Sequence, residues 1–190
     1  MKGGKKLMSI YYAGIGSRET PYEVLEYFTN IAAYFSSKGF ILRSGGAGGA
    51  DKAFENGCDR VNGVKEVYLP WRNFERSDSN LVVSNIKAFE IAESFHPNWI
   101  RLSDGAKKLQ ARNSHQVLGF NLESPSNFII CWTKGGKGQG GTGQALRIAR
   151  HYDIPIFDAG SYTVIDEIKS NLKAFLLNYE LLSEEDFKVK

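Results

Sequence analysis

The chain has 190 residues, of which 42% are hydrophobic and 24% charged, and its formal net charge is +3. This length allows one sizeable hydrophobic core, and so small a charge neither requires nor excludes a polyanionic partner. The 20 glycines gather at predicted strand-to-helix junctions without a repeating period, which excludes collagen-like and low-complexity chains. No apolar run is long enough for a signal peptide or a membrane span, so we expect a cytoplasmic protein with no membrane partner.

Strand-like and helix-like segments alternate along the chain. Strands are predicted at 9–13, 40–42, 66–69, 128–132 and 155–157, and helices at 21–38, 50–57, 85–119 with a break near 96–98, 144–152 and 164–177. The strands are apolar throughout, which is typical of a parallel sheet covered on both faces. We therefore expect a single doubly wound, Rossmann-like α/β domain with about five strands over residues 8–182, with flexible ends at 1–7 and 183–190.

Three glycine-rich loops follow predicted strands, at residues 14–18, 44–49 and 135–144. The carboxyl ends of parallel strands meet at one edge of a sheet, so these loops should lie together. Glycine lets the backbone approach an anion closely, and the N–H groups at a helix start favour negative charge. The pattern predicts a phosphate-binding pocket; it matches neither a Walker A loop nor a dinucleotide fingerprint, because Glu19 replaces the third glycine of the latter.

Several side chains in these loops have two interpretations. The guanidinium of Arg18 suits bidentate contact with phosphate, or it is an ordinary surface group. Asp51 either caps the helix that it begins or accepts a ligand hydroxyl. The third loop is either a phosphate site or a flexible lid. Cys58 and Cys131 stand in no metal-ligand spacing, so we expect buried or incidental thiols and no metal site. No cofactor is expected either.

Three segments in the order GIGSRETP, SGGAGGADKAFENG and QARNSHQVLG resemble successive motifs of the DNA-processing protein A (DprA/Smf) domain, a member of the SLOG superfamily. The resemblance covers roughly residues 10–160 and implies a Rossmann-like fold. It also implies that a set of residues faces the pocket, namely Gly16, Ser17, Arg18, Ser44, Gly45, Gly46, Asp51, Arg112 and Asn113. The second motif lacks an arginine of the family pattern, and the chain lacks room for the additional domains of full-length DprA, which weakens a DNA-loading role.

The segment GGTGQALRIAR resembles the GG-GT-xx-E motif of LOG-type phosphoribohydrolases in the same superfamily. The glutamate of that motif falls on Ala145, which cannot bind ribose or act as an acid or base. Glu123 or Asp51 are the remaining candidates for a catalytic carboxylate. The substitution favours binding over catalysis.

The preferred hypothesis is non-catalytic binding of a phosphate-bearing nucleotide or nucleotide-derived signal, with Trp71, Phe74 or Trp132 stacking on the base. The alternatives are binding of single-stranded DNA and hydrolysis of a nucleotide N-glycosidic bond, and pairing of two copies of the chain stays open. A DNA-binding stripe would use Lys52, Arg72, Lys107, Lys108, Arg112, Lys134 and Lys137. The predicted ligand-binding residues are Gly14, Gly16, Ser17, Arg18, Ser44, Gly45, Gly46, Asp51, Trp71, Arg112, Asn113, Gly141, Thr142, Gly143 and Gln144.

Overall fold

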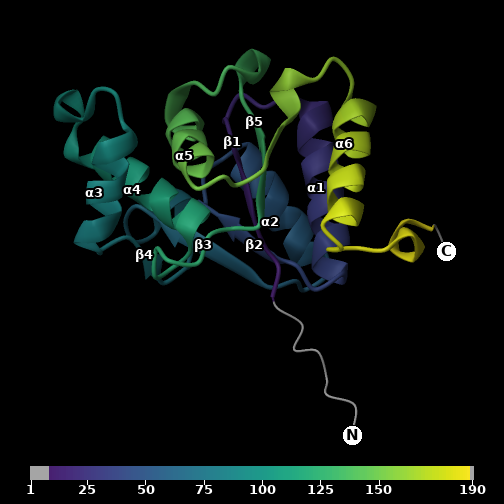
Figure 1. Cartoon of the computed structure of the whole chain (residues 1–190). Coiled ribbons are helices and arrows are strands. Elements are labelled where there is room, and N and C mark those ends of the chain that lie inside the picture. Colours follow the sequence, from purple (N-terminus) through teal and green to yellow (C-terminus); the bar gives the residue numbers. More distant parts are fainter. Residues whose placement is uncertain (1–8, 189–190) are drawn as a thin grey trace, which may run out of the picture.

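The computed structural model describes residues 9–188 and contains a six-stranded parallel sheet in the order β4-β3-β2-β1-β5-β6 (Figure 1). The strands are β1 (Tyr11–Gly16), β2 (Ile41–Ser44), β3 (Lys65–Leu69), β4 (Leu81–Val82), β5 (Phe128–Trp132) and β6 (Ile156–Asp158). The predicted α/β class and parallel sheet are confirmed, with six strands rather than five. The additional strand, β4, has only two residues, too few to show a pattern in the sequence, and it is defined by its pairing with β3.

The helices are α1 (Tyr22–Ser37), α2 (Ala50–Arg60), α3 (Ile86–Phe95), α4 (Asp104–Leu118), α5 (Gly140–His151) and α6 (Ile165–Asn178). The break between α3 and α4 lies where the sequence predicts it. One helix start differs from the prediction, since α5 begins at Gly140 rather than Gln144.

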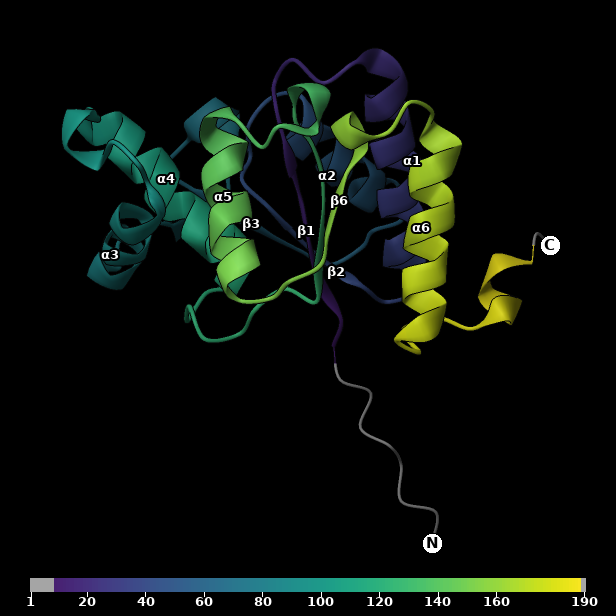
Figure 2. The same cartoon turned by 45° about the horizontal axis from the view of Figure 1, so that its top comes forward.

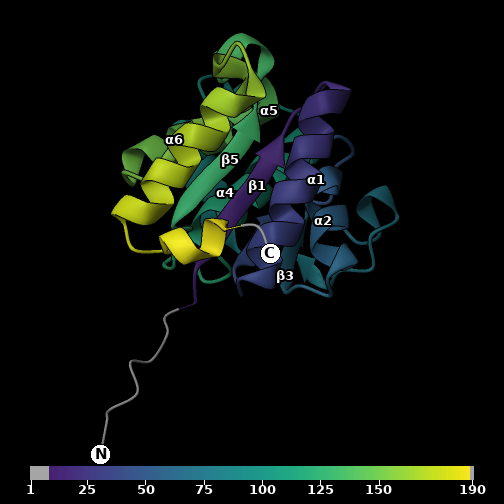
Figure 3. The ribbon, with the colours of Figure 1, turned by 90° about the vertical axis from the view of Figure 1, so that its right-hand side faces the viewer.

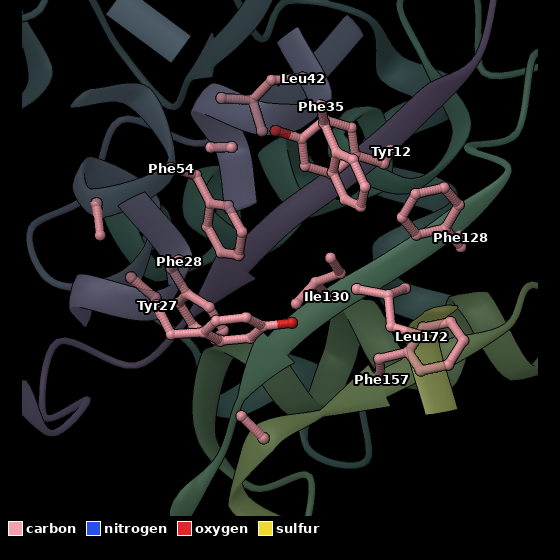
Figure 4. Packing of buried hydrophobic residues seen from close by; sticks show 14 of the residues in the cluster. Tyr12, Tyr27, Phe28, Phe35, Leu42, Phe54, Phe128, Ile130, Phe157 and Leu172 are labelled. Carbon is pink, nitrogen blue, oxygen red and sulfur yellow. The ribbon is translucent and has the colours of Figure 1, made fainter. Parts of the chain in front are cut away.

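Helices cover both faces of the sheet. One core contains side chains of α1, α2 and α6 together with Tyr12, Phe128 and Ile130, and Figure 4 shows its closely packed aromatic rings. The other contains Ala13 and Ile15 with side chains of α3, α4 and α5. Figure 3 looks onto α1 and α6, with β1 and β5 behind them. Successive residues of β1 thus face opposite layers, which is why its strand sequence is apolar throughout.

The C-terminal segment packs against α1. Asp186 accepts a hydrogen bond from the Lys38 ammonium (2.9 Å), and its carbonyl accepts one from the Tyr34 hydroxyl (2.8 Å). The sequence predicts a free end from Ser183, but these partners are distant in the chain and only the fold brings them together. Residues 1–7 of the other predicted flexible end lie outside the described residues. Within residues 9–188, no helix has the length and apolar character to cross a membrane.

Candidate ligand-binding cleft

A cleft of about 520 Å³ opens at the carboxyl edge of the sheet, beside the ends of β1 and β5. Strands β2 and β5 flank β1, so the chain leaves β1 in one direction along the sheet and returns to its other side for β5. Such a topological switch point is where doubly wound folds bind ligands. Figure 2 turns this edge toward the viewer. Predicted residues that line the cleft are Gly16, Ser17, Arg18, Asp51, Arg112, Asn113, Gly141 and Thr142.

The other predicted residues lie beneath or beside the cleft, outside its lining. Those packed beneath it, fully or almost fully buried, are Gly14, Ser44, Gly45, Gly46, Gly143 and Gln144. Trp71 is 39% exposed and lines a neighbouring hollow together with Arg18 and Phe74. Phe74 also lines the main cleft, whereas Trp132 packs against the core. Of the three aromatic candidates for base stacking, Phe74 is the one in the cleft wall.

The first loop uses its own N–H groups to fasten itself to its neighbours. The Gly16 N–H donates to Asp51 Oδ1 (3.2 Å), and the Ser17 N–H donates to the Trp132 carbonyl (3.2 Å). The Glu19 N–H donates to the Ser17 hydroxyl (3.0 Å). The contribution of this loop to a ligand site therefore comes mainly from the Arg18 side chain.

The second loop is also closed by internal hydrogen bonds. The buried carboxylate of Glu55 accepts from the Ser44 hydroxyl (2.8 Å) and the Gly46 N–H (3.1 Å). Gly49 has φ +81°, and a Cβ there would lie 2.6 Å from the Arg18 Cα. The glycines of this loop thus allow the first two loops to pack together. This role is structural and differs from the predicted phosphate binding.

The third loop ends in the open start of α5. Its N-cap residue, Gln139, makes no side-chain cap hydrogen bond, and the first turn, residues 140–142, lines the cleft. The first N–H groups of a helix have no intrahelical acceptor and carry a partial positive charge. The Asn113 amide fixes this turn to α4 by donating to the Gly141 carbonyl (3.0 Å). This helix start is the part of the predicted cradle that is open to an anion.

A buried ion pair forms the floor. Arg112 Nη1 lies 3.6 Å from Asp51 Oδ2, and it also donates to the Gly45 carbonyl. Burial raises the pKa of Asp51 to about 6, although the Arg112 guanidinium acts in the opposite direction. Burial likewise lowers the pKa of Arg112. Because the two charges balance each other, Arg112 organises the floor and is not a free cation.

Gln116 is a cleft residue that the sequence analysis missed. It lines the floor one helical turn after Arg112, is only 2% exposed, and its Nε2 has no hydrogen-bond partner among residues 9–188. Positions four apart share one face of a helix, so the available signal was a polar residue on the same face as the motif arginine. That signal is weak, because polar residues are common on helix surfaces.

At the rim, Arg18 forms an ion pair with Glu75. Glu75 belongs to the long segment after β3, in which Asn73, Glu75 and Arg76 have left-handed φ values of 58°, 49° and 61°. Left-handed backbone at side-chain-bearing residues is strained and tends to occur at functional sites. The segment after β3 therefore reaches the cleft through Phe74 and engages Arg18, whose side chain is 63% exposed.

The candidate catalytic carboxylates separate in the structure. Ala145 lines the cleft where the hydrolase motif has glutamate. Glu123 lines a different hollow and pairs with Lys87 (3.1 Å). Of the two candidate catalytic carboxylates, Asp51 and Glu123, only Asp51 lines the cleft, and it is engaged by Gly16 and Arg112. Within the described part of the chain, no three His, Cys, Asp or Glu residues gather into a group that could hold a metal ion.

No protein-family model and no curated protein sequence matches the chain. Among solved structures, DNA processing protein A from Helicobacter pylori, described for its single-stranded DNA binding mode, is 16% identical with a TM-score of 0.56 over 89% of this chain and 81% of that one. The molybdenum cofactor carrier protein from Chlamydomonas reinhardtii is 14% identical, with a TM-score of 0.50 over 88% and 85%. DprA from Streptococcus pneumoniae is 12% identical, with a TM-score of 0.50 over 90% of this chain and 56% of that one. At these identities the likeness establishes the fold alone, and it confirms the Rossmann-like α/β fold that the sequence predicts.

Proposed function

We propose that the cleft binds the phosphate of a nucleotide or nucleotide-derived ligand without converting it. The observation that carries this proposal is the uncapped first turn of α5, which opens into a cleft that Arg18 also lines. The helix start supplies N–H donors and the guanidinium supplies a fixed charge, and both favour a phosphate. A cleft of about 520 Å³ is within the range of small-molecule sites.

The rest of the ligand would find both apolar and polar walls. The half-buried Leu109 and the largely buried Phe74 line the cleft and give it an apolar wall against which a base could pack. Asp51, Arg112 and Gln116 form a polar floor suited to the sugar. A nucleotide combines these three chemical parts, and inorganic phosphate alone would leave the apolar wall unused.

Binding without turnover is favoured by the residue at the position that is glutamate in the hydrolase motif. Ala145 brings no acid or base to the cleft wall. Asp51 accepts N–H bonds from Gly16 and Ala47 and faces Arg112, so its carboxylate already supports the loops. Incubation of the protein with each nucleotide, followed by chromatography, tests this part of the proposal, and release of a free base would contradict it.

The phosphate site is tested by Gly141→Asp against Gly141→Asn. A Cβ at this position meets no atom within 4 Å, and a carboxylate at a helix start stabilises the helix while repelling a bound anion. We expect Gly141→Asp to weaken binding by at least about 10-fold and Gly141→Asn to change it little. Calorimetry with inorganic phosphate, nucleoside monophosphates, cyclic nucleotides and ADP-ribose measures this, and equal affinities in the two variants would contradict the site.

Single-stranded DNA is the second candidate ligand. The fold is that of a protein described as binding single-stranded DNA, and the exposed side chains of Arg72, Lys134 and Lys137 lie on the loops that follow β3 and β5. Protein binding to the phosphate backbone of DNA weakens steeply as the salt concentration rises, because binding releases counterions. Oligonucleotide binding with a steep salt dependence, together with weak binding of mononucleotides, would favour this candidate over the first.

A further inference from the structure

Gln116 carries a buried amide whose nitrogen is unpaired within the described part of the chain. The residue is 2% exposed, and its Nε2 makes no hydrogen bond within residues 9–188. Buried polar side chains are nearly always hydrogen-bonded, because an unpaired one loses its contact with water and gains nothing in return. Since Gln116 also lines the cleft, a group that enters the cleft from solvent can complete its hydrogen bonding.

The neighbours of this amide supply an acceptor as well as donors. Gln116 Nε2 and Arg112 Nη1 lie 2.7 Å and 1.8 Å from the point that a Cβ on Gly45 would occupy, so the two side chains adjoin above that glycine. The same Nη1 lies 3.6 Å from Asp51 Oδ2. A carboxylate has about four lone-pair sites, and the N–H groups of Gly16 and Ala47 leave room for another donor.

A hydroxyl group suits this floor, because it can accept from the amide and donate to the carboxylate at once. Gln116 follows Asn113, which holds the first turn of α5, by three residues of α4, a rise of about 4.5 Å. The amide and the first turn of α5 line the same cleft. We propose that Gln116, together with Asp51, binds the ribose 2′-hydroxyl and makes the cleft selective for ribonucleotides over deoxyribonucleotides, an inference that rests on the proposed function.

The test compares wild type with Gln116→Met, which keeps the length of the side chain and removes its hydrogen bonding. Calorimetry would use ribose 5-phosphate, 2-deoxyribose 5-phosphate and the 5′-monophosphates of adenosine, 2′-deoxyadenosine and 3′-deoxyadenosine. Wild type should bind the ribose forms about 10-fold tighter than a matched form lacking the recognised hydroxyl. Gln116→Met should lower the affinity for the ribose forms to that of the deoxy form and leave the deoxy form unchanged.

Further arms separate the ways in which the inference can fail. Equal wild-type affinity for ribose and deoxy forms, with both lost in Gly141→Asp, would overturn the role of Gln116 and leave the phosphate site standing. Equal weakening of all ligands in Gln116→Met would indicate a structural role and would also overturn it. No binding of any phosphate compound by wild type would overturn the proposed function and this inference together. Thermal unfolding should show an unchanged or higher Tm for Gln116→Met, and Gln116→Leu repeats the comparison if the methionine variant does not fold.

Discussion

The ion pair between Arg18 and Glu75 places an internal carboxylate where the proposed phosphate would bind its arginine. An incoming anion has to compete with Glu75 for Arg18. Its apparent affinity is lowered by the free energy needed to break the ion pair between Arg18 and Glu75. Replacing Glu75 by Gln keeps the size of the side chain and removes its charge. We therefore expect Glu75→Gln to bind phosphate-bearing ligands more tightly than wild type.

The size of the gain follows from the exposure of the pair. The side chains of Arg18 and Glu75 are 63% and 40% exposed, and solvent-exposed ion pairs contribute about 0.2–1 kcal/mol. Releasing Arg18 should thus increase affinity by up to about 5-fold. The same screening by solvent makes the gain dependent on salt, so it should shrink as ionic strength rises.

Calorimetry at low and high ionic strength measures this effect, with an Arg18→Ala background as the control. Without the arginine there is nothing to release, so adding Glu75→Gln to Arg18→Ala should change affinity little. An unchanged affinity in Glu75→Gln alone would refute the competition. A gain in affinity that persists in the Arg18→Ala background would also refute the competition, because the gain would then come from removing the repulsion between the Glu75 carboxylate and the anion.

Two further variants test the loops beneath the cleft. Gly49→Ala should lower the free energy of unfolding by more than about 1 kcal/mol, because φ at Gly49 is +81° and the new Cβ would lie 2.6 Å from Arg18 Cα. At Gly48 a Cβ meets no atom within 4 Å, so Gly48→Ala should be nearly neutral. Chemical denaturation measures both variants. Burial raises the pKa of Asp51 from 3.8 to about 6, so the folded chain holds a proton that the unfolded chain has released between these values. Stability from this group is therefore present below the lower value and lost as pH rises through the higher one. The Tm of Asp51→Asn should rise relative to wild type between about pH 4 and about pH 6, and a constant difference across this range would contradict the shifted pKa.

The regular elements follow from local sequence because their signals are local. The apolar run of β5 predicts a buried strand without knowledge of its neighbours. The proline in residues 96–98 separates two helices whatever they pack against. Strand β4 and the start of α5 were not predictable in this way. A strand of two residues, such as β4, is too short to show a periodicity. Glycine has low helix propensity, so a helix that starts at glycines 140 and 141 depends on its tertiary surroundings.

The candidate site divides along the same line. The glycine-rich loops, their gathering at one sheet edge and the alanine at position 145 are properties of sequence order and motif, so the sequence was sufficient for them. Which N–H groups stay free was a tertiary matter, because the acceptors Glu55, Asp51 and Trp132 come from elements that only folding brings together.

By itself, therefore, the sequence determined the alternation of strands and helices, the edge at which the loops meet and the presence of alanine at position 145, since each depends on residues close together in the chain or on a motif. The tertiary structure alone decided that the first turn of α5 opens into the cleft, that Glu75 engages Arg18 and that Gln116 Nε2 has no partner among residues 9–188. Those features are contacts, or missing contacts, between segments far apart in sequence, and hydrogen-bond partners at such separation are fixed only by the packing of the folded chain.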